Sequence, residues 1–203
     1  MVRKCKEDAE KTRQAILESA LDIFSVKGYA KTTFDEIAIH AGFTKGAVYW
    51  YFKNKADLVA ALIVEYVQRK QVEVEKISSK NCTLDGLVDN FCLWAQRSQN
   101  DLRYAKFNRF ILCQMEWSEA VLERVDKSLI DLKKLHLEKI NKVLVKSREN
   151  GELRDDVDID KMQHVIMSSY MGIMFSSLSK RYDYDVVEMI RIGLGALFNG
   201  MKK

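Results

Sequence analysis

The stretch that decides the fold is TTFDEIAIHAGFTKGAVYWYFKNK, residues 32–55. Thr33, followed three residues later by Glu36, forms a capping box, which marks the start of a helix. Gly42 ends this helix after about two turns, because glycine accepts the left-handed conformation of a helix C-cap. Thr44 caps a further short helix, and a longer amphipathic helix precedes the whole stretch. Two short helices joined by a glycine-containing turn predict a helix-turn-helix motif.

The last short helix carries four aromatic side chains in succession, more than one face can bury. Residues four apart share a face of an α-helix. Val48 and Phe52 form the one stripe without a polar group, so we expect both to face the core. Tyr49, on the stripe of Lys45, is then left facing outward. Exposed aromatic side chains beside lysine are unfavourable for solubility unless a partner covers them.

The outward side chains of this helix suit a nucleic-acid backbone. Tyrosine hydroxyls, the indole N–H, lysine ammoniums and helix N-terminal amides all donate to phosphate oxygens. Gly46, on the stripe of Trp50, has no side chain, so the helix backbone can come close to a groove wall. Lys45, in the first turn, can reach a base edge such as guanine O6 and N7. The alternative is that Tyr49, Trp50 and Tyr51 simply pack against neighbouring helices.

Residues 12–60 closely resemble the DNA-binding domain of the tetracycline-repressor (TetR) family, and most of all the branch that represses multidrug-efflux genes. The resemblance rests on an AxxIFxxxGY segment, a TTxxxIAxxAG helix and the segment TKGAVYWYFKNKxDL. It implies a homodimeric transcriptional repressor that binds a palindromic operator on double-stranded DNA. It also implies that a small-molecule inducer binds the larger helical domain and releases the protein from its operator.

The resemblance implies roles for individual residues. Thr33 caps the second helix at a phosphate, and Thr44 and Lys45 open the recognition helix, with Lys45 at a position that often contacts bases. The chain departs from the commonest pattern at Tyr51, often histidine, and at Lys45, often arginine. Lysine lacks the fork with which arginine pairs two acceptors. The remaining phosphate contacts are those of Tyr49, Trp50, Tyr51 and Lys55.

The composition favours an all-helical protein with a basic N-terminal part. The 203 residues include no proline, which disfavours turn-rich β-structure. Residues 1–55 hold ten Lys or Arg against seven Asp or Glu, which accounts for +3 of the net charge of +4. We predict an all-α fold with a three-helix helix-turn-helix DNA-binding domain at residues 1–55. A larger helical ligand-binding and dimerisation domain follows at residues 56–203.

The last two predicted helices, residues 159–180 and about 184–200, are the candidate dimer interface. Small side chains interleave with large apolar ones on both helices, which permits close helix approach and supplies apolar area. We favour an interface over a core role for the outer faces. The small residues are Ser168, Ser169, Gly172, Ser176, Gly193 and Gly195.

Aromatic and sulfur-bearing side chains in the second half supply material for a pocket that takes a hydrophobic or cationic drug. Glu116 is the candidate counter-charge for a cationic ligand. The alternative for each residue is an ordinary place in the core. The candidate ligand-binding residues are Phe91, Trp94, Tyr104, Phe107, Phe110, Met115, Glu116, Trp117, Met167, Tyr170 and Met174.

Other functional classes lack support in the sequence. It contains no nucleophile–base spacing, metal-ligand cluster or glycine-rich phosphate loop, so we expect neither an enzyme nor a cofactor or metal. The four cysteines form no CxxC pair, and the N-terminus has no signal peptide, which favours the cytoplasm over an oxidising compartment or a membrane. The alternatives left open are a helical enzyme or carrier, and a DNA-binding protein that acts without an inducer, for example as an activator.

Overall fold

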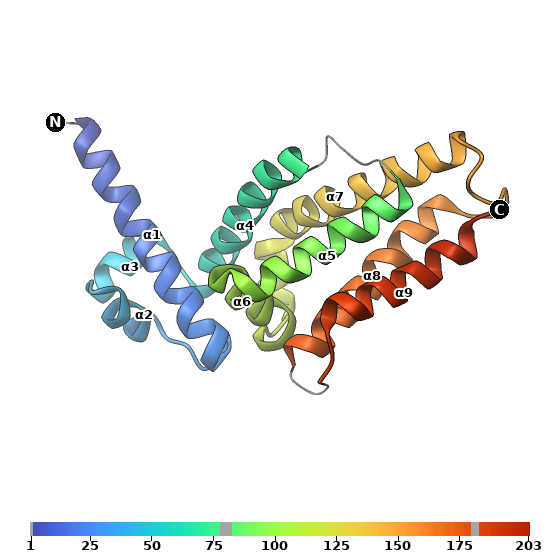
Figure 1. Cartoon of the computed structure of the whole chain (residues 1–203). Coiled ribbons are helices and arrows are strands. Elements are labelled where there is room, and N and C mark those ends of the chain that lie inside the picture. Colours follow the sequence, from blue (N-terminus) through green and yellow to red (C-terminus); the bar gives the residue numbers. More distant parts are fainter. Residues whose placement is uncertain (1, 78–82, 180–182) are drawn as a thin grey trace. The chain divides into compact units, whose positions relative to one another are not determined.

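The computed structural model describes residues 2–77, 83–179 and 183–203 (Figure 1). Over these residues the chain forms helices and their connections, with one isolated antiparallel bridge between Leu153 and Lys202. The predicted all-α class is confirmed. In chain order the helices are α1 (Val2–Lys27), α2 (Phe34–Ala41), α3 (Lys45–Tyr51), α4 (Lys55–Ile77), α5 (Leu84–Asn100), α6 (Leu102–Arg109), the π-helical turn η1 (Phe110–Gln114), α7 (Glu119–Glu149), α8 (Ile159–Leu178) and α9 (Val186–Met201).

The helix-turn-helix begins and ends where its capping residues require. The Thr33 hydroxyl accepts a hydrogen bond from the Glu36 N–H at 3.3 Å, and the Glu36 carboxylate accepts one from the Thr33 N–H at 3.0 Å, so the capping box is complete. Gly42 ends α2 with a φ of 75°, a left-handed conformation that favours glycine. The Thr44 hydroxyl then caps α3 by accepting from the Ala47 N–H at 3.2 Å.

The chain divides into two compact units. The first unit joins Met1–Tyr66 to Lys106–Leu129, and the second joins Val67–Ala105 to Ile130–Lys203. The first unit therefore holds the helix-turn-helix together with the last residues of α6, the π-helical turn and the start of α7. The predicted boundary after residue 55 separates a DNA-binding domain from a ligand-binding and dimerisation domain, and these functional assignments stay predictions.

The core of the first unit forms between α1, α2 and α3. Ile16, Leu17 and Phe24 of α1 have no exposed surface, and neither do Ile37 of α2 and Val48 of α3. Packing of α1 on α2 and of α2 on α3 brings these side chains together. Burial of each such side chain contributes roughly 1.5–3 kcal/mol, so this small core holds α3 in a fixed place.

The C-terminal half of α1 also packs against the segment of the same unit that begins at residue 106. The rings of Phe24 and Phe110 stack with centroids 4.8 Å apart and planes 10° from parallel. The Lys106 ammonium lies 2.6 Å from an Asp22 carboxylate oxygen. Phe110 opens the π-helical turn, in which one extra residue is inserted into the helical spacing. Stacking and an ion pair thus fix this segment to α1.

Gly28 ends α1 against the same segment. Its φ is 84°, and a Cβ at this position would lie 3.2 Å from Oε1 and 3.3 Å from the backbone oxygen of Gln114. The next residue, Tyr29, donates its N–H to that backbone oxygen at 3.1 Å. Both the backbone angle and the close approach of Gln114 therefore favour glycine here.

The second unit is built from α5, α7, α8 and α9. Its α9 packs against both α5 and α8. None of the described helices has the length and apolar character that crossing a membrane requires. The side chains of this unit without exposed surface are Leu87, Phe91, Ala95, Ile140, Leu144, Ile166, Ile190 and Leu194.

Candidate nucleic-acid interface

Helix α3 presents one buried and one exposed face, as its sequence predicts. Val48 is fully buried, and Phe52, the C-cap residue of α3, is 4% exposed. Tyr49 and Trp50 are exposed by 51% and 75%. Tyr51 is intermediate between these classes. The core therefore holds one stripe of the helix and leaves large aromatic surface outside.

The exposed rings are held by neighbours at their edges. Tyr49 meets Phe34 of α2 edge-on, with ring centroids 4.9 Å apart, and Trp50 meets Tyr51 edge-on at 4.6 Å. Such edge-to-face pairs contribute about 0.5–1.5 kcal/mol beyond the area that they bury. The rings are thus oriented before any partner arrives, which lowers the entropic cost of binding.

The first turn of α3 is open for approach. If Gly46 carried a Cβ atom, its nearest neighbour would be the Thr44 hydroxyl oxygen, 3.8 Å away. The Thr44 hydroxyl accepts a hydrogen bond from the Ala47 N–H and can still donate its proton outward, whereas the Thr33 hydroxyl donates to the Glu36 carboxylate at 3.2 Å. The positive end of the helix dipole lies at the same place. This arrangement suits an anion such as a phosphate.

Lys45, the first residue of α3, pairs with an acid from α2. Its ammonium lies 2.6 Å from Oδ2 of Asp35, and both side chains are about half exposed. The hydrogen bond to Asp35 and the charge of that carboxylate raise the pKa of Lys45 above its ordinary value. Lys45 is therefore positively charged at neutral pH. Sequence reasoning missed Asp35, because residues ten apart become neighbours only through the turn between the two helices.

Lys55, which opens α4, holds the connection between α1 and α2. Its ammonium donates to the backbone oxygens of Tyr29 and Ala30 at 2.7 and 3.1 Å and lies 4.6 Å from the centre of the Tyr29 ring. Partial burial lowers the pKa of Lys55. An ammonium has three protons to donate, so the predicted phosphate contact has to share this group with the two carbonyls.

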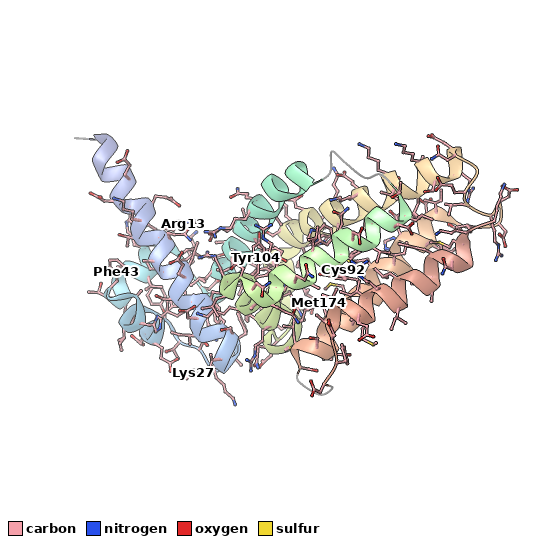
Figure 2. All side chains as sticks on the ribbon, in the orientation of Figure 1. Arg13, Lys27, Phe43, Cys92, Tyr104 and Met174 are labelled. Atoms are coloured by element: carbon pink, nitrogen blue, oxygen red, sulfur yellow. The ribbon has the colours of Figure 1, made fainter. Side chains whose placement is uncertain are left out.

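Two exposed apolar residues near α3 were also missed. Phe43, in the turn before α3 (Figure 2), is 37% exposed, and Ile39 of α2 is 80% exposed. Lys27, at the end of α1 (Figure 2), pairs with Glu36 of the capping box. The helical pattern around Ile39 does favour an outward position, but nothing in that pattern assigns it a partner.

Six of the predicted ligand residues lie in the second unit, and three of them form an aromatic cluster. Phe91 and Trp94 of α5 meet edge-on at 5.3 Å, and the Phe91 ring lies 4.7 Å from that of Tyr170 on α8. Burial strongly raises the pKa of the Tyr170 hydroxyl. Met174 and Tyr104 (Figure 2) are buried too, and Met167 is partly exposed.

The other five predicted ligand residues belong to the first unit. Phe107 stacks on Tyr66 with centroids 4.0 Å apart, and Phe110 stacks on Phe24. Glu116 and Trp117 are exposed, and Met115 is intermediate. The two phenylalanines thus have aromatic partners within their own unit, and the ligand-binding role of all five residues stays a prediction.

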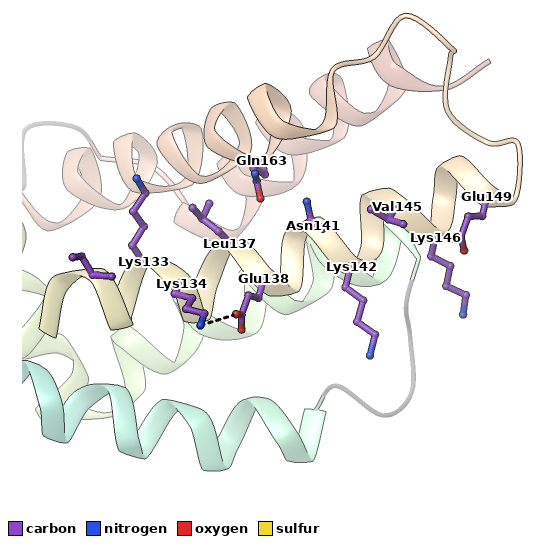
Figure 3. A pocket seen from close by; sticks show the side chains of 11 residues that line it. Lys133, Lys134, Leu137, Glu138, Asn141, Lys142, Val145, Lys146, Glu149 and Gln163 are labelled. Carbon is purple, nitrogen blue, oxygen red and sulfur yellow. Dashed lines mark ion pairs between the residues drawn. The ribbon is translucent and has the colours of Figure 1, made fainter. Parts of the chain in front are cut away.

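A groove of about 830 Å³ runs along α7 in the second unit (Figure 3). Gln163 of α8 also contributes to its lining, so the groove lies beside both α7 and α8. Lys134 and Glu138 form an ion pair within it, at 3.6 Å. None of the predicted ligand residues is among its lining. The lining residues are Ile130, Lys133, Lys134, Leu137, Glu138, Asn141, Lys142, Val145, Lys146, Glu149 and Gln163.

Comparison with known proteins assigns the helix-turn-helix. Residues 16–62 match the model of the bacterial regulatory proteins of the tetR family. The chain is 29% identical over 180 residues to the probable HTH-type transcriptional regulator ArpR of Pseudomonas putida, which covers 84% of this chain and 81% of that protein. Residues 16–62 form a DNA-binding domain of the tetR family. The prediction of a transcriptional regulator is confirmed, since the matched family and the relatives are regulators and not enzymes.

Solved structures share the fold of this chain over nearly its whole length. NalD of Pseudomonas aeruginosa, a secondary repressor of the MexAB-OprM multidrug efflux pump, superposes with a TM-score of 0.78 at 23% identity over 97% of this chain and 98% of its own. The SmeT–triclosan complex superposes with a TM-score of 0.78 at 24% identity over 95% and 92%. The predicted arrangement of a helix-turn-helix domain before a larger helical region is confirmed.

Proposed function

We propose that this chain is a TetR-family homodimeric repressor of a multidrug-efflux gene. It binds a palindromic operator through α2 and α3 and is released by a hydrophobic or cationic small molecule. The observation that carries the proposal is the face of α3 on which Tyr49 and Trp50 are exposed by 51% and 75% beside the charged Lys45. Large aromatic side chains gathered on one exposed face mark an interaction surface.

The mode of DNA binding follows from the position of each side chain along α3. A recognition helix enters the major groove with its N-terminal residues toward the base edges. Lys45 and Gly46 are then nearest to the bases, and Tyr49 and Trp50, one turn later, reach the phosphates. Thr33, Thr44, Tyr51 and Lys55 supply the remaining backbone contacts. A DNA-binding regulator acts in the compartment that holds the DNA, which supports the predicted cytoplasmic location.

Homodimerisation is supported by the exposed face of α8. Val165, Met171 and Phe175 are exposed by 41%, 37% and 40%, with the exposed Gly172 on the same side. Ile192 of α9 is exposed by 57%. Apolar side chains interleaved with glycine on two helices that pack together are the material of a four-helix contact between two copies. A two-fold dimer would match a palindromic operator.

The ligand proposal rests on the cluster of Phe91, Trp94 and Tyr170 in the second unit. The SmeT–triclosan complex shows that a protein of this fold binds a small molecule. The Lys139 ammonium already lies 5.4 Å from the centre of the Trp94 ring. Because two cations compete for one aromatic face, an uncharged hydrophobic ligand is favoured over a cationic one at this cluster. Release follows if the ligand binds better to the conformation that does not fit the operator.

A salt titration tests DNA binding. The wild-type protein is bound to a duplex from upstream of its own coding region, and affinity is measured from about 50 to 200 mM salt. We expect affinity to fall steeply, because each neutralised phosphate contributes about 0.9 to the slope of log K against log salt. Absence of binding at every salt concentration would overturn the proposal.

Two variants connect this result to α3. Trp50→Ala should weaken binding about tenfold, a loss of about 1.4 kcal/mol, and lower the thermal midpoint by only a few degrees through the lost edge-to-face contact with Tyr51. Leu102→Ala, which truncates a side chain exposed by 69% on α6, is the matched control and should change neither quantity. If Trp50→Ala binds as tightly as the wild type, α3 is not the contact surface.

A further inference from the structure

The ion pair between Lys45 and Asp35 joins the two helices of the helix-turn-helix at their exposed ends. The Lys45 ammonium is 2.6 Å from Asp35 Oδ2, and the two side chains are exposed by 52% and 57%. Lys45 is the first residue of α3 and Asp35 the second of α2. A positive donor and a negative acceptor are therefore presented side by side, next to the open backbone at Gly46.

The fold gains little from this pair. Exposed ion pairs typically contribute about 0–1 kcal/mol, because water screens the charges and two long side chains lose freedom. The neighbouring acid, Glu36, has a structural task, since it completes the capping box and pairs with Lys27. Asp35 belongs to neither of those contacts. Its carboxylate would also repel phosphates if it faced a DNA backbone.

A carboxylate on a DNA-reading surface is favourable where it can accept a hydrogen bond from a base. In the major groove the cytosine N4 amino group is the donor that Asp and Glu accept from, and guanine O6 and N7 are the acceptors that Lys donates to. In a G·C pair, guanine O6 and cytosine N4 are hydrogen-bonded to each other, so they lie about 2.9 Å apart. The separation of the Lys45 and Asp35 groups is similar, so each can meet one of the two base atoms.

An A·T pair fits the same two groups less well. It also places a donor, adenine N6, beside an acceptor, thymine O4. Next to adenine N6, however, lies the acceptor N7, which repels a carboxylate, and next to thymine O4 lies a methyl group, which obstructs an ammonium. In a G·C pair the ammonium meets two acceptors, O6 and N7 of guanine, and the outer neighbour of cytosine N4 is a C–H group that does not repel a carboxylate. Both ends of the ion pair therefore favour G·C.

We propose that Lys45 and Asp35 act as one unit that reads a G·C base pair in each half-site, with Lys45 donating to guanine O6 or N7 and Asp35 accepting from cytosine N4. This inference rests on the proposed function, since it assigns a base preference to the same DNA-binding surface. The pair adds discrimination that an unpaired lysine would lack, because a lysine alone can donate to any base edge that presents acceptors.

Selection from a randomised duplex library tests the assignment without knowledge of the operator. Wild-type protein, Asp35→Asn and Lys45→Met are each used to enrich bound duplexes, and the enriched sequences are compared position by position. Asp156→Asn, in the exposed pair of Asp156 with Arg154 in the second unit, is the matched control. The best wild-type duplex and its single base-pair variants are then titrated against every protein.

We expect one G·C pair in each wild-type half-site to lose its preference in Asp35→Asn and in Lys45→Met. Replacing that pair should weaken wild-type binding on the order of tenfold and Asp35→Asn binding far less. Asp156→Asn should select the wild-type sequence. The inference is overturned if Asp35→Asn keeps the wild-type preference, if it strengthens binding to all duplexes equally, or if the affected pair is A·T. Failure of the wild type to enrich any duplex would instead refute the proposed function.

Discussion

Gly46→Ala should separate stability from DNA binding, because the two respond with opposite signs. The position is the second of α3, has ordinary helical geometry, and offers an added Cβ only the Thr44 hydroxyl at 3.8 Å, an ordinary contact distance. Alanine is favoured over glycine in a helix by up to about 1 kcal/mol. We therefore expect the free energy of unfolding of the first unit to be unchanged or to rise by at most that amount.

The same methyl group should weaken DNA binding. It projects from the first turn of α3, where the proposed complex brings the helix backbone against the groove wall. Moving the helix outward lengthens the hydrogen bonds of Lys45 and Tyr49 beyond their effective range. We expect a loss of about tenfold to a hundredfold, or about 1.4–2.8 kcal/mol. Fluorescence anisotropy with a labelled duplex measures the affinity, and urea unfolding followed by circular dichroism measures the stability.

Gly42→Ala is the control for this comparison. Its φ of 75° disfavours any side chain, although nothing lies within 4 Å of the added Cβ. It should destabilise the protein by about 1–2 kcal/mol through backbone strain alone. If Gly46→Ala destabilises to a similar degree, α3 is not held as described. If it is stable and binds the duplex as tightly as the wild type, the close approach of the backbone is refuted.

Two further outcomes are expected. Phe175→Glu should yield folded monomers in sedimentation velocity, because the side chain is 40% exposed and a two-fold contact would place like charges together; a dimer that persists would exclude this face. The hydrogen bond from Lys27 and that from the Thr33 N–H hold the pKa of Glu36 below its ordinary value of 4.5, so its contribution to stability is present above that pH and is lost as the pH falls through the lower, folded value. Glu36→Gln keeps the capping geometry without titrating, so its thermal midpoint should lie below that of the wild type at neutral pH and approach it in acid; a gap independent of pH would contradict this account.

The parts of the site that local rules govern could be predicted from the sequence. Thr33, Gly42 and Thr44 act through hydrogen bonds and backbone angles within a few residues of themselves, so their pattern gives the helix boundaries. The helical period likewise separates the buried Val48 from the exposed Trp50. These rules need no knowledge of the rest of the chain, which is why they succeed.

The parts that depend on distant segments could not be predicted. Asp35 meets Lys45 only because the turn between α2 and α3 has a particular geometry. The aromatic residues expected in one pocket fall into two compact units, and Phe110 is the partner of Phe24, far away in sequence. Composition identifies such side chains as apolar, but it does not say which other element will cover them.

The contact of α1 with the segment after residue 106 has a consequence for dividing the protein. Phe24 has no exposed surface and stacks on Phe110, and Tyr29 donates to the Gln114 backbone oxygen. A fragment cut after residue 55 would expose that ring and lose that hydrogen-bond acceptor. A chimaera that transfers the DNA-reading specificity to another regulator of this family should therefore carry residues 106–129 along with the N-terminal helices. In this chain, the part that must be transferred consists of two segments that are separated in the sequence.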